Sequence, residues 1–521
     1  MDENGAKITR RAFLAGFALA AWQGLRHLDP RRRLVGAPSV TPSHTPSPAP
    51  TVARTQTPSR AAGGFDVVIL NGRVIDPESG FDSIANVGIK GDRIDTISTG
   101  ALRGTRTIDA SGKVVSAGFI DNLSYEPNEY GVWFKLADGI TTTLGMHGID
   151  GSAERFFTNG LSNRWPVHYG GAFDDPWWRA YGGPGLSPSG KPTSSAISAL
   201  ARDAERQILD GFIGVDFEPE YDPGTSFEEE IALARVAARH DMPFCSHVRY
   251  ADAQHEQDAI TEVVEVAKQT GVAVHVDHIN STGGTFTLPA RLQQIQQARD
   301  TGIDITACEY PYNFWSTFLG SARFAPGWQD RFRISYGDLA LPGTGERLTA
   351  SSFKRYRAEN KVVIAYAIPE DTVRTALASS LVMFGSDTIL IRGVGRHPRG
   401  AGSASRILGH HVRDEKVLSL KDGLAKLTIM PAKRVEKGAP QMKRKGRMQE
   451  GMDADVTIFD PRTIIDLATV RDPYQYSRGV DWVLVMGNVV KDPSGMHHKE
   501  RHGTPIISTP AIAAGKYGVT A

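Results

Sequence analysis

The sequence predicts an α/β fold in which a central barrel of alternating strands and helices stands beside a small β-sandwich. Three observations support this fold class. Residues 65–121 alternate apolar and polar side chains around Asn-Gly, Gly-Asp and Ser-Gly turns. A similar pattern returns in residues 446–460 and 480–490. Between them, short apolar runs alternate with amphipathic segments at the spacing of βα units. Neither β region completes a sheet alone, so the sandwich is expected to use both chain ends.

Length and composition fit a loop-rich α/β enzyme. The chain has 521 residues, of which 22% are charged, which is enough for one large domain and a smaller one. The formal net charge of +1 gives no reason to expect a nucleic-acid partner. Cys245 and Cys308 both fall in predicted strands, so we expect buried thiols rather than a disulfide or a metal pair.

The N-terminus carries the pattern of an export signal. Arg10 and Arg11 precede a short apolar run with a small-residue cleavage pattern at residues 18–20. Residues 1–35 are therefore predicted to be a twin-arginine signal, with the export machinery as a partner and a periplasmic or envelope location. An ordinary basic N-terminus is the alternative. Residues 36–64 are rich in Pro, Ser, Thr and Ala and are expected to form an extended linker.

The remaining chain divides at changes of pattern. The first part of the β-sandwich is expected at 65–117 and the barrel at 118–436. Within the barrel, residues of about 320–360 break the βα rhythm and indicate an insertion, which could cover the barrel mouth. The second part of the sandwich is expected at 437–495, followed by a C-terminal tail at 496–521.

Local signals place several barrel helices. Residues 194–210 and 251–268 carry apolar positions at helical spacing. Gly271 stops the second of these helices. Ser226, with Glu229 three residues later, predicts a capping box at the start of another helix.

Two predicted strands each end in a histidine. The apolar runs at 243–246 and 272–276 are followed by His247 and His278. The carboxyl ends of parallel barrel strands point into one mouth, so these imidazoles are expected to converge. Neutral imidazole is the commonest metal ligand, which favours a metal site. Two unrelated polar loop residues are the alternative.

A third strand end carries a carboxylate. The strand at 381–384 is followed by Gly-Ser and then Asp387. An aspartate at the mouth is suited to binding a metal, to acting as a general base, or to both. A turn or capping role is the alternative.

Nine short motifs occur in an order that resembles one superfamily. They are VIDPESG, SAGFID, DGITTTLG, SHVRY, VDHIN, YPYNFWST, GSD, HPRG and EGMDADVTIFDP. Over residues 65–495 the chain resembles the amidohydrolase superfamily, and most closely its N-acyl-D-amino-acid deacylase (D-aminoacylase) branch. The resemblance implies a (β/α)8 barrel beside a β-sandwich. It also implies zinc-dependent hydrolysis of the amide bond of N-acyl-D-amino acids.

The resemblance implies roles for individual residues. His247 and His278 match the histidines that hold the tightly bound metal. Asp387 matches the aspartate that activates water and then protonates the leaving amine. Arg399 matches the arginine that binds the substrate carboxylate, for which a planar bidentate donor is suited. The positions that match the lining of the same pocket are Tyr312, Ser316 and Thr317. Ordinary loop packing is the alternative for Arg399 and for these three residues.

The metal motif departs from the family pattern. The family's paired histidines on the first barrel strand are replaced by Leu123 and Tyr125, so one metal position is missing or rebuilt. His147 stands where the family usually has a cysteine ligand. Together with His247 and His278 it could form a three-histidine site with an open fourth position, holding one zinc per chain. The alternative is a loop histidine beside an empty site.

Two further departures concern the substrate. Asn280 replaces a lysine of the family and is expected to face the substrate. Asp216 and Glu218 replace small residues at the end of the fourth strand. Three interpretations are open for these carboxylates. They replace the polar side chains lost at Leu123 and Tyr125, they add a metal ligand, or they lie exposed in a loop without a role.

The sequence therefore predicts an exported metallohydrolase that cleaves a C–N amide bond of a small carboxylate-bearing substrate. Metal-activated water is the expected nucleophile, with Asp387 as general base and acid. N-acyl-D-amino acids are the leading substrate class. The alternative is a catalytically inactive barrel that serves as a binding or envelope scaffold. The sequence leaves the stereochemistry, the acyl group and the oligomeric state open.

Overall fold

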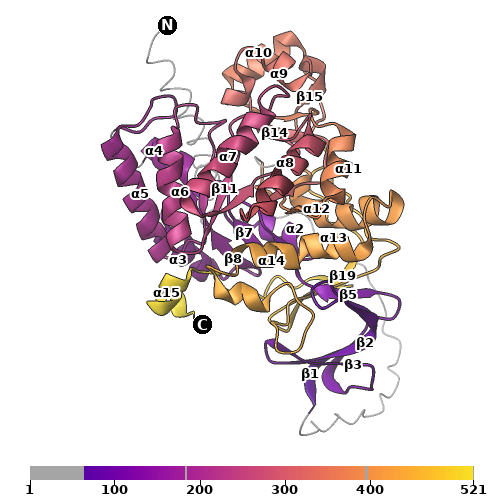
Figure 1. Cartoon of the computed structure of the whole chain (residues 1–521). Helices are drawn as coiled ribbons and strands as arrows, with labels where there is room; N and C mark the ends of the chain where they lie inside the picture. Colours follow the sequence, from indigo (N-terminus) through magenta and orange to yellow (C-terminus); the bar gives the residue numbers. More distant parts are fainter. Residues whose placement is uncertain (1–63, 182–184, 394–396, 520–521) are drawn as a thin grey trace, which may run out of the picture.

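The structure is a computed structural model that describes residues 64–181, 185–393 and 397–519 (Figure 1). The predicted export signal at 1–35 and the linker through residue 63 lie outside the described residues. Within the described ranges we find no helix with the length and apolar character that a bilayer span requires.

A nine-stranded sheet joins the two ends of the chain. Its order is β21-β20-β19-β18-β5-β1-β2-β3, and β4 pairs with β1. The pairing of β5 with β18 is antiparallel and connects the early strands to the late ones. The prediction of a β domain built from both chain ends is therefore confirmed. The strands are β1 (Phe65–Asp76), β2 (Phe81–Lys90), β3 (Arg93–Ser98), β4 (Gly104–Asp109), β5 (Val114–Ala117), β18 (Val456–Phe459), β19 (Val480–Val485), β20 (Asn488–Asp492) and β21 (Gly495–Met496).

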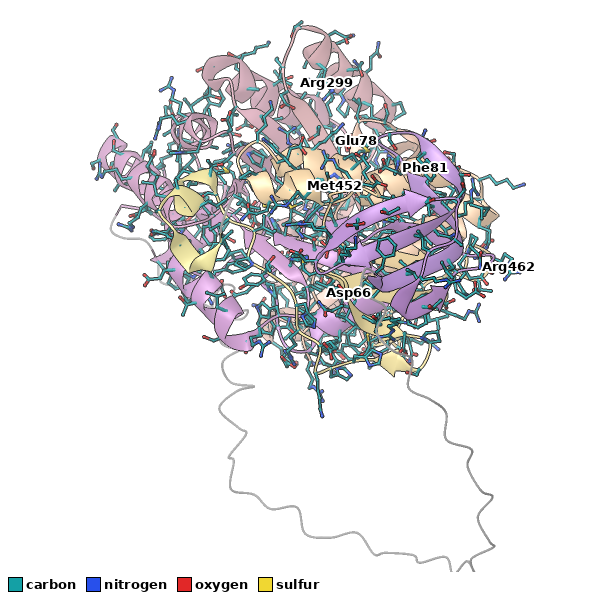
Figure 2. All side chains as sticks on the ribbon, turned by 90° about the horizontal axis from the view of Figure 1, so that it is seen from below. Asp66, Glu78, Phe81, Arg299, Met452 and Arg462 are labelled. Carbon is teal, nitrogen blue, oxygen red and sulfur yellow. The ribbon has the colours of Figure 1, made fainter. Side chains whose placement is uncertain are left out.

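The sheet encloses its own core because apolar residues alternate along its strands. Ile69, Val87, Ile94 and Ile458 come from different strands and pack in one buried cluster. Arg447 ties this domain to the barrel, since its guanidinium donates to both Glu78 and Glu436, the residue that follows α14. Figure 2 labels Glu78 where the β domain meets the orange helices.

Parallel strands form the barrel. They hydrogen-bond in two groups, β6-β7-β8 and β9-β10-β11-β12-β13-β17. β8 and β9 are consecutive and separated only by Ala172, whose N–H donates to the Gly145 carbonyl. The ring closes where the Asp387 N–H donates to the Leu123 carbonyl at 2.6 Å. The predicted α/β barrel is confirmed. The strands are β6 (Phe119–Asp121), β7 (Ile140–Gly145), β8 (His168–Gly171), β9 (Phe173–Asp174), β10 (Val215–Phe217), β11 (Pro243–Ser246), β12 (Ala273–Val276), β13 (Ile305–Glu309) and β17 (Val382–Phe384).

Helices cover the outside of the barrel (Figure 1). The predicted capping box is present, because Ser226 and Glu229 bond each other's backbone N–H groups at the start of α6. Gly271 ends α7 in the left-handed conformation, as predicted. The helices are α2 (Gly131–Ala137), α3 (Ala153–Asn163), α4 (Asp175–Tyr181), α5 (Ser194–Leu209), α6 (Phe227–Arg239), α7 (Glu256–Thr270), α8 (Leu288–Asp300), α11 (Glu370–Ala378), α12 (Arg399–Arg406), α13 (Leu420–Leu427), α14 (Ile429–Val435) and α15 (Thr509–Ala513).

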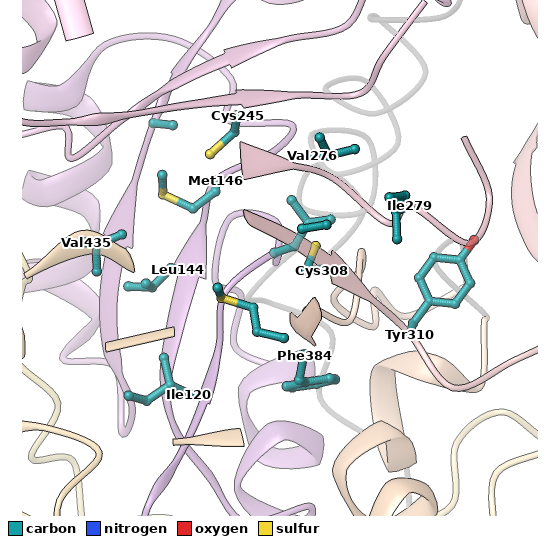
Figure 3. Close-up of a cluster of buried hydrophobic side chains, with 14 of the residues drawn as sticks. Ile120, Leu144, Met146, Cys245, Val276, Ile279, Cys308, Tyr310, Phe384 and Val435 are labelled. Carbon is teal, nitrogen blue, oxygen red and sulfur yellow. The ribbon is translucent and has the colours of Figure 1, made fainter. Parts of the chain in front are cut away.

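The barrel interior is filled by side chains from several strands. Figure 3 shows Leu144, Val276 and Phe384 gathered in this cluster. Cys245 and Cys308 lie in the same cluster, where both are buried and free, which confirms the prediction of buried thiols. Because this packing fills the barrel below the strand ends, the polar residues at those ends sit on a rigid base.

Residues 315–365 form a separate small unit between β13 and α11. Its sheet has the order β14-β16-β15, and its helices α9 and α10 lie beyond α7 and α8 in Figure 1. Aromatic rings from Trp315, Phe324, Trp328 and Phe353 pack against one another and hold the unit together. Its elements are β14 (Trp315–Phe318), α9 (Trp328–Phe332), β15 (Leu339–Ala340), α10 (Ala350–Ala358) and β16 (Val362–Ala365).

Candidate metal centre and active site

Polar side chains gather at the carboxyl ends of the barrel strands. His147 follows β7, His247 directly follows β11, His278 lies two residues after β12 and Asp387 lies three after β17. His278 and Asp387 have positive φ angles of 29° and 52°, a region that side-chain-bearing residues seldom adopt. The fold therefore brings together the four residues expected to hold the metal and perform the chemistry.

The three histidines share one buried space. Each of His147, His247 and His278 offers a ring nitrogen within 4.8 Å of those of the other two. The Nδ1 atom of His247 lies 3.1 Å from the Nε2 atom of His278. All three residues are at most 4% exposed. Three imidazoles at this separation are suited to binding a single divalent ion.

The opposite nitrogen of each imidazole is engaged by an oxygen. Nδ1 of His147 lies 3.3 Å from Asp216 and 3.4 Å from Glu218. Nε2 of His247 lies 2.7 Å from Glu220. Nδ1 of His278 lies 3.2 Å from the Thr282 hydroxyl. Such partners fix ring orientation in metal sites and leave the other nitrogen free to bind the ion.

Burial governs the charge of these groups. Burial, with Arg323 nearby, holds the pKa of His247 well below its usual range. Burial likewise lowers the pKa of His278. Both rings are therefore neutral at pH 7, the form that binds metal. Burial also opposes charge on His147, but Glu218 and Asp387 outweigh it and raise the pKa of that ring.

The carboxylates of the fourth strand are part of the site. The interpretation of Asp216 and Glu218 as exposed loop carboxylates is wrong, because their exposed fractions are 0% and 7%. Asp216 lies in β10, and one of its carboxylate oxygens is 3.3 Å from Nδ1 of His147. Burial raises the pKa of both carboxyl groups well above the usual range.

Asp387 stands between the histidines and a guanidinium. One carboxylate oxygen lies 2.7 Å from Arg399 Nη2. The other accepts a hydrogen bond from the Tyr125 hydroxyl at 3.3 Å. Asp387 oxygens also lie 4.0 Å from Nε2 of His147 and of His278. Tyr125, at a lost histidine position, therefore contacts the Asp387 carboxylate.

Arg399 has N–H donors that no described residue accepts. Its side chain is 4% exposed and lies over the ring of Tyr310, 4.4 Å from the ring centroid. Among the described residues, its Nε and Nη1 atoms have no hydrogen-bond partner. A buried guanidinium with two unused nitrogens is arranged to receive an anion.

Tyr312 and Thr317 were also expected to line the pocket, and their contacts differ. The Tyr312 hydroxyl donates to Asp466, and Tyr310 rather than Tyr312 lies against Arg399. Thr317 accepts a hydrogen bond from Tyr221, whose ring lies 4.8 Å from that of His247.

Two expected pocket residues remain. Asn280 is fully buried, and its amide donates to the Tyr310 carbonyl. Ser316 lies on β14 beside Thr317 and is half-buried.

The insertion supplies a cation that the sequence did not reveal. Arg323 is 2% exposed and lies 3.4 Å from Glu220, the carboxylate that contacts His247. Its guanidinium also stacks on Trp315 and donates to the Ser281 carbonyl. The link from Arg323 through Glu220 to His247 connects the insertion to the three-histidine site.

A buried ion pair supports the loop that carries Asp387. Lys135 Nζ lies 2.5 Å from Asp121 and 2.7 Å from the Ser386 hydroxyl. Asp121 in turn accepts hydrogen bonds from the backbone N–H and hydroxyl of Ser386. This network fixes the residue immediately before Asp387.

Removing the charge of this network should destabilise the fold. Lys135→Met leaves Asp121 buried without its cation, a change that costs about 3–5 kcal/mol. We expect a clearly lower urea midpoint of unfolding. Arg206→Met breaks a solvent-exposed pair with Asp203 and serves as the control, for which we expect little change. Equal midpoints for the two variants would contradict the assigned role.

Comparisons with known proteins place the chain among relatives that have been described. A family model described as "Amidohydrolase family" matches residues 371–491. The N-acyl-D-glutamate deacylase of Alcaligenes xylosoxydans xylosoxydans is 30% identical over 477 residues, covering 84% of this chain and 95% of the relative. The D-aminoacylase of the same organism is 28% identical over 470 residues, covering 81% and 94%.

A solved structure shows the same architecture. It is the N-acyl-D-glutamate deacylase from Bordetella bronchiseptica, complexed with zinc and a phosphonate inhibitor that mimics the tetrahedral intermediate of the reaction. It superposes with a TM-score of 0.73 at 25% identity and covers 85% of this chain and 100% of its own.

Proposed function

The chain belongs to the amidohydrolase family, in its D-aminoacylase branch, and from that premise we propose that it hydrolyses N-acyl-D-amino acids with a divalent metal. Membership makes it a hydrolase of carbon–nitrogen bonds other than peptide bonds. The proposed metal ligands are His147, His247 and His278. The observation that carries the proposal is that each ring turns one nitrogen into a shared space while an oxygen engages the other.

The donor set fits zinc. Three imidazole nitrogens with an open fourth position are a common catalytic arrangement for this ion. When bound, zinc supplies a Lewis acid that polarises a carbonyl and lowers the pKa of water. Leu123 and Tyr125 supply no histidine, so the proposed ligand set does not use the first barrel strand.

Asp387 is placed to move the proton. Its carboxylate lies 4.0 Å from two of the histidine rings, so it can accept a proton from the attacking water. It then returns that proton to the leaving nitrogen. Tyr125 and Arg399 contact opposite oxygens of the carboxylate and fix its orientation.

Arg399 defines the substrate class. Its two unused nitrogens favour a substrate that carries a carboxylate close to the scissile amide. Binding this carboxylate would fix the amide beside the histidines and Asp387. An N-acyl amino acid has its carboxylate one carbon from the amide nitrogen and meets this requirement.

A substrate panel tests the proposal. We would measure hydrolysis of N-acetyl-D-amino acids, their L-enantiomers, and the matching carboxamides. Turnover should favour the free D-acids. Arg399→Leu should lower kcat/KM for the acids by about 10- to 100-fold, because a charged hydrogen bond is lost.

The carboxamides test whether Arg399 acts by binding the substrate carboxylate. Both wild type and Arg399→Leu should hydrolyse them poorly and with a much smaller difference between the two proteins. Equal wild-type turnover of acids and carboxamides would contradict carboxylate recognition. A catalytically inactive scaffold would hydrolyse no member of the panel.

A further inference from the structure

We propose that Glu220 and Arg323 are positioning residues for the metal centre, so that the insertion sets how tightly the ion is bound. Glu220 contacts a ligand histidine directly, and Arg323 acts chiefly through Glu220. The inference rests on the proposed function, because it assumes that His247 binds the ion. It is carried by three contacts: that of Glu220 with His247, that of Arg323 with Glu220, and that of Arg323 with the turn after His278.

Glu220 engages His247 by the ring nitrogen opposite the one nearest His278. Nε2 of His247 lies 2.7 Å from a Glu220 oxygen, whereas Nδ1 lies 3.1 Å from Nε2 of His278. A carboxylate only accepts hydrogen bonds, so this contact places the hydrogen on Nε2 and the lone pair on Nδ1. Nδ1 is then the nitrogen that binds the ion. Contacts of this kind fix the ring of a metal-binding histidine and strengthen its binding.

Glu220 does not belong to a strand. It lies three residues after the end of β10, in a turn in which the N–H groups of Tyr221 and Asp222 donate to the Glu218 carbonyl. Its side chain is nevertheless only 9% exposed. A buried carboxylate is costly unless a cation or a donor compensates it, and water outside the protein would compensate it freely. A partner is therefore needed to retain Glu220 against His247.

Arg323 of the insertion is that partner. Its Nη1 atom lies 3.4 Å from the same Glu220 oxygen that contacts His247. The arginine side chain is 2% exposed, and its guanidinium lies over the rings of Trp315 and Phe332. These two rings pack against each other inside the insertion, so they fix the guanidinium where it meets Glu220.

The same arginine contacts the turn that carries a second ligand. Nη2 of Arg323 donates to the Ser281 carbonyl at 3.1 Å. The Ser281 N–H donates in turn to the His278 carbonyl at 2.7 Å, which closes the turn where His278 has its positive φ. An apolar side chain at position 323 would therefore remove a contact beside each of His247 and His278.

A purely structural ion pair is the alternative. Such a pair would contribute to the stability of the fold but would leave the zinc affinity of the folded protein unchanged. Zinc affinity therefore distinguishes a positioning role from a structural one.

The dissociation constant for zinc tests the inference. The full-length chain is stripped of metal, and zinc is titrated in competition with a chromophoric chelator. In Glu220→Leu we expect the dissociation constant of the tightest site to rise about 10- to 100-fold. Glu220→Gln keeps an oxygen that accepts from His247 and should restore most of the affinity. Arg323→Leu should weaken zinc binding in the same direction.

The double variant Glu220→Leu/Arg323→Leu shows whether Arg323 acts through Glu220. Apolar replacement of a whole buried ion pair is often neutral for stability, so this variant should fold even if a single variant does not. Its loss of zinc affinity should be smaller than the product of the two single losses. A loss equal to that product would overturn the role of Arg323.

Arg347→Leu is the matched control. Arg347 also lies in the insertion, where its guanidinium stacks on Tyr366 and donates to the Gly337 carbonyl. This variant should keep the wild-type dissociation constant. An equal loss of zinc affinity in Arg347→Leu and Arg323→Leu would show a general disturbance of the insertion and overturn the specific role of Arg323.

His247→Ala separates this inference from the proposed function. If His247→Ala loses tight zinc binding while the double variant binds zinc like wild type, the inference is overturned and the three-histidine ligand set stands. If His247→Ala binds zinc as tightly as wild type, the ligand set is wrong and the inference is overturned with it.

Discussion

Asp387→Asn is expected to abolish nearly all turnover while leaving the protein folded and its metal in place. The amide has almost the same shape as the carboxylate but cannot accept a proton from water. Loss of general acid–base catalysis lowers kcat by about 10²- to 10⁴-fold. The measurement is kcat on the best N-acyl-D-amino acid, with metal content determined on the same sample.

Tyr125→Phe provides the comparison for this variant. It removes the hydroxyl that donates to Asp387 at 3.3 Å but leaves the proton acceptor intact. We expect a far smaller loss of kcat. An Asp387→Asn enzyme with wild-type kcat and full metal content would show that another group moves the proton.

His278→Ala is expected to release the metal of the three-histidine site and reduce turnover to the background rate. Two remaining imidazoles bind a divalent ion much more weakly than three, and Lewis-acid activation is lost with the ion. The measurements are the zinc-binding curve and kcat at limiting zinc.

His275→Gln is the matched control, because His275 lies in β12 on the same segment. Its ring is buried and contacts Asn122 and Thr306 rather than the histidines of the proposed metal site. The variant should keep the three-histidine metal. Retention of metal and turnover by His278→Ala would rule out this ligand set.

Much of the site could be predicted because its positions follow from the barrel. His247 and His278 directly follow or closely follow parallel strands, and such strand ends always face the same mouth. The sheet built from both chain ends also followed from simple alternation, since a period of two is a strong local signal.

Other features depend on contacts that no local pattern records. Tyr310 lies against Arg399, whereas the Tyr312 hydroxyl donates to Asp466, and the sequence does not distinguish these two tyrosines. The pairing of Lys135 with Asp121 spans the first strand and its helix. Asp216 was open to interpretation as a loop carboxylate because its strand has only three residues, too few to show a period.

The contact between Arg323 and Glu220 constrains how the insertion can change among related sequences. The arginine lies in residues 315–365, yet the carboxylate that compensates it belongs to the barrel. Deleting or exchanging this unit would leave Glu220 buried against His247 without its cation. We infer that Arg323 and Glu220 are retained or lost together among related sequences. Engineering that swaps the insertion to alter substrate range must therefore redesign Glu220 at the same time.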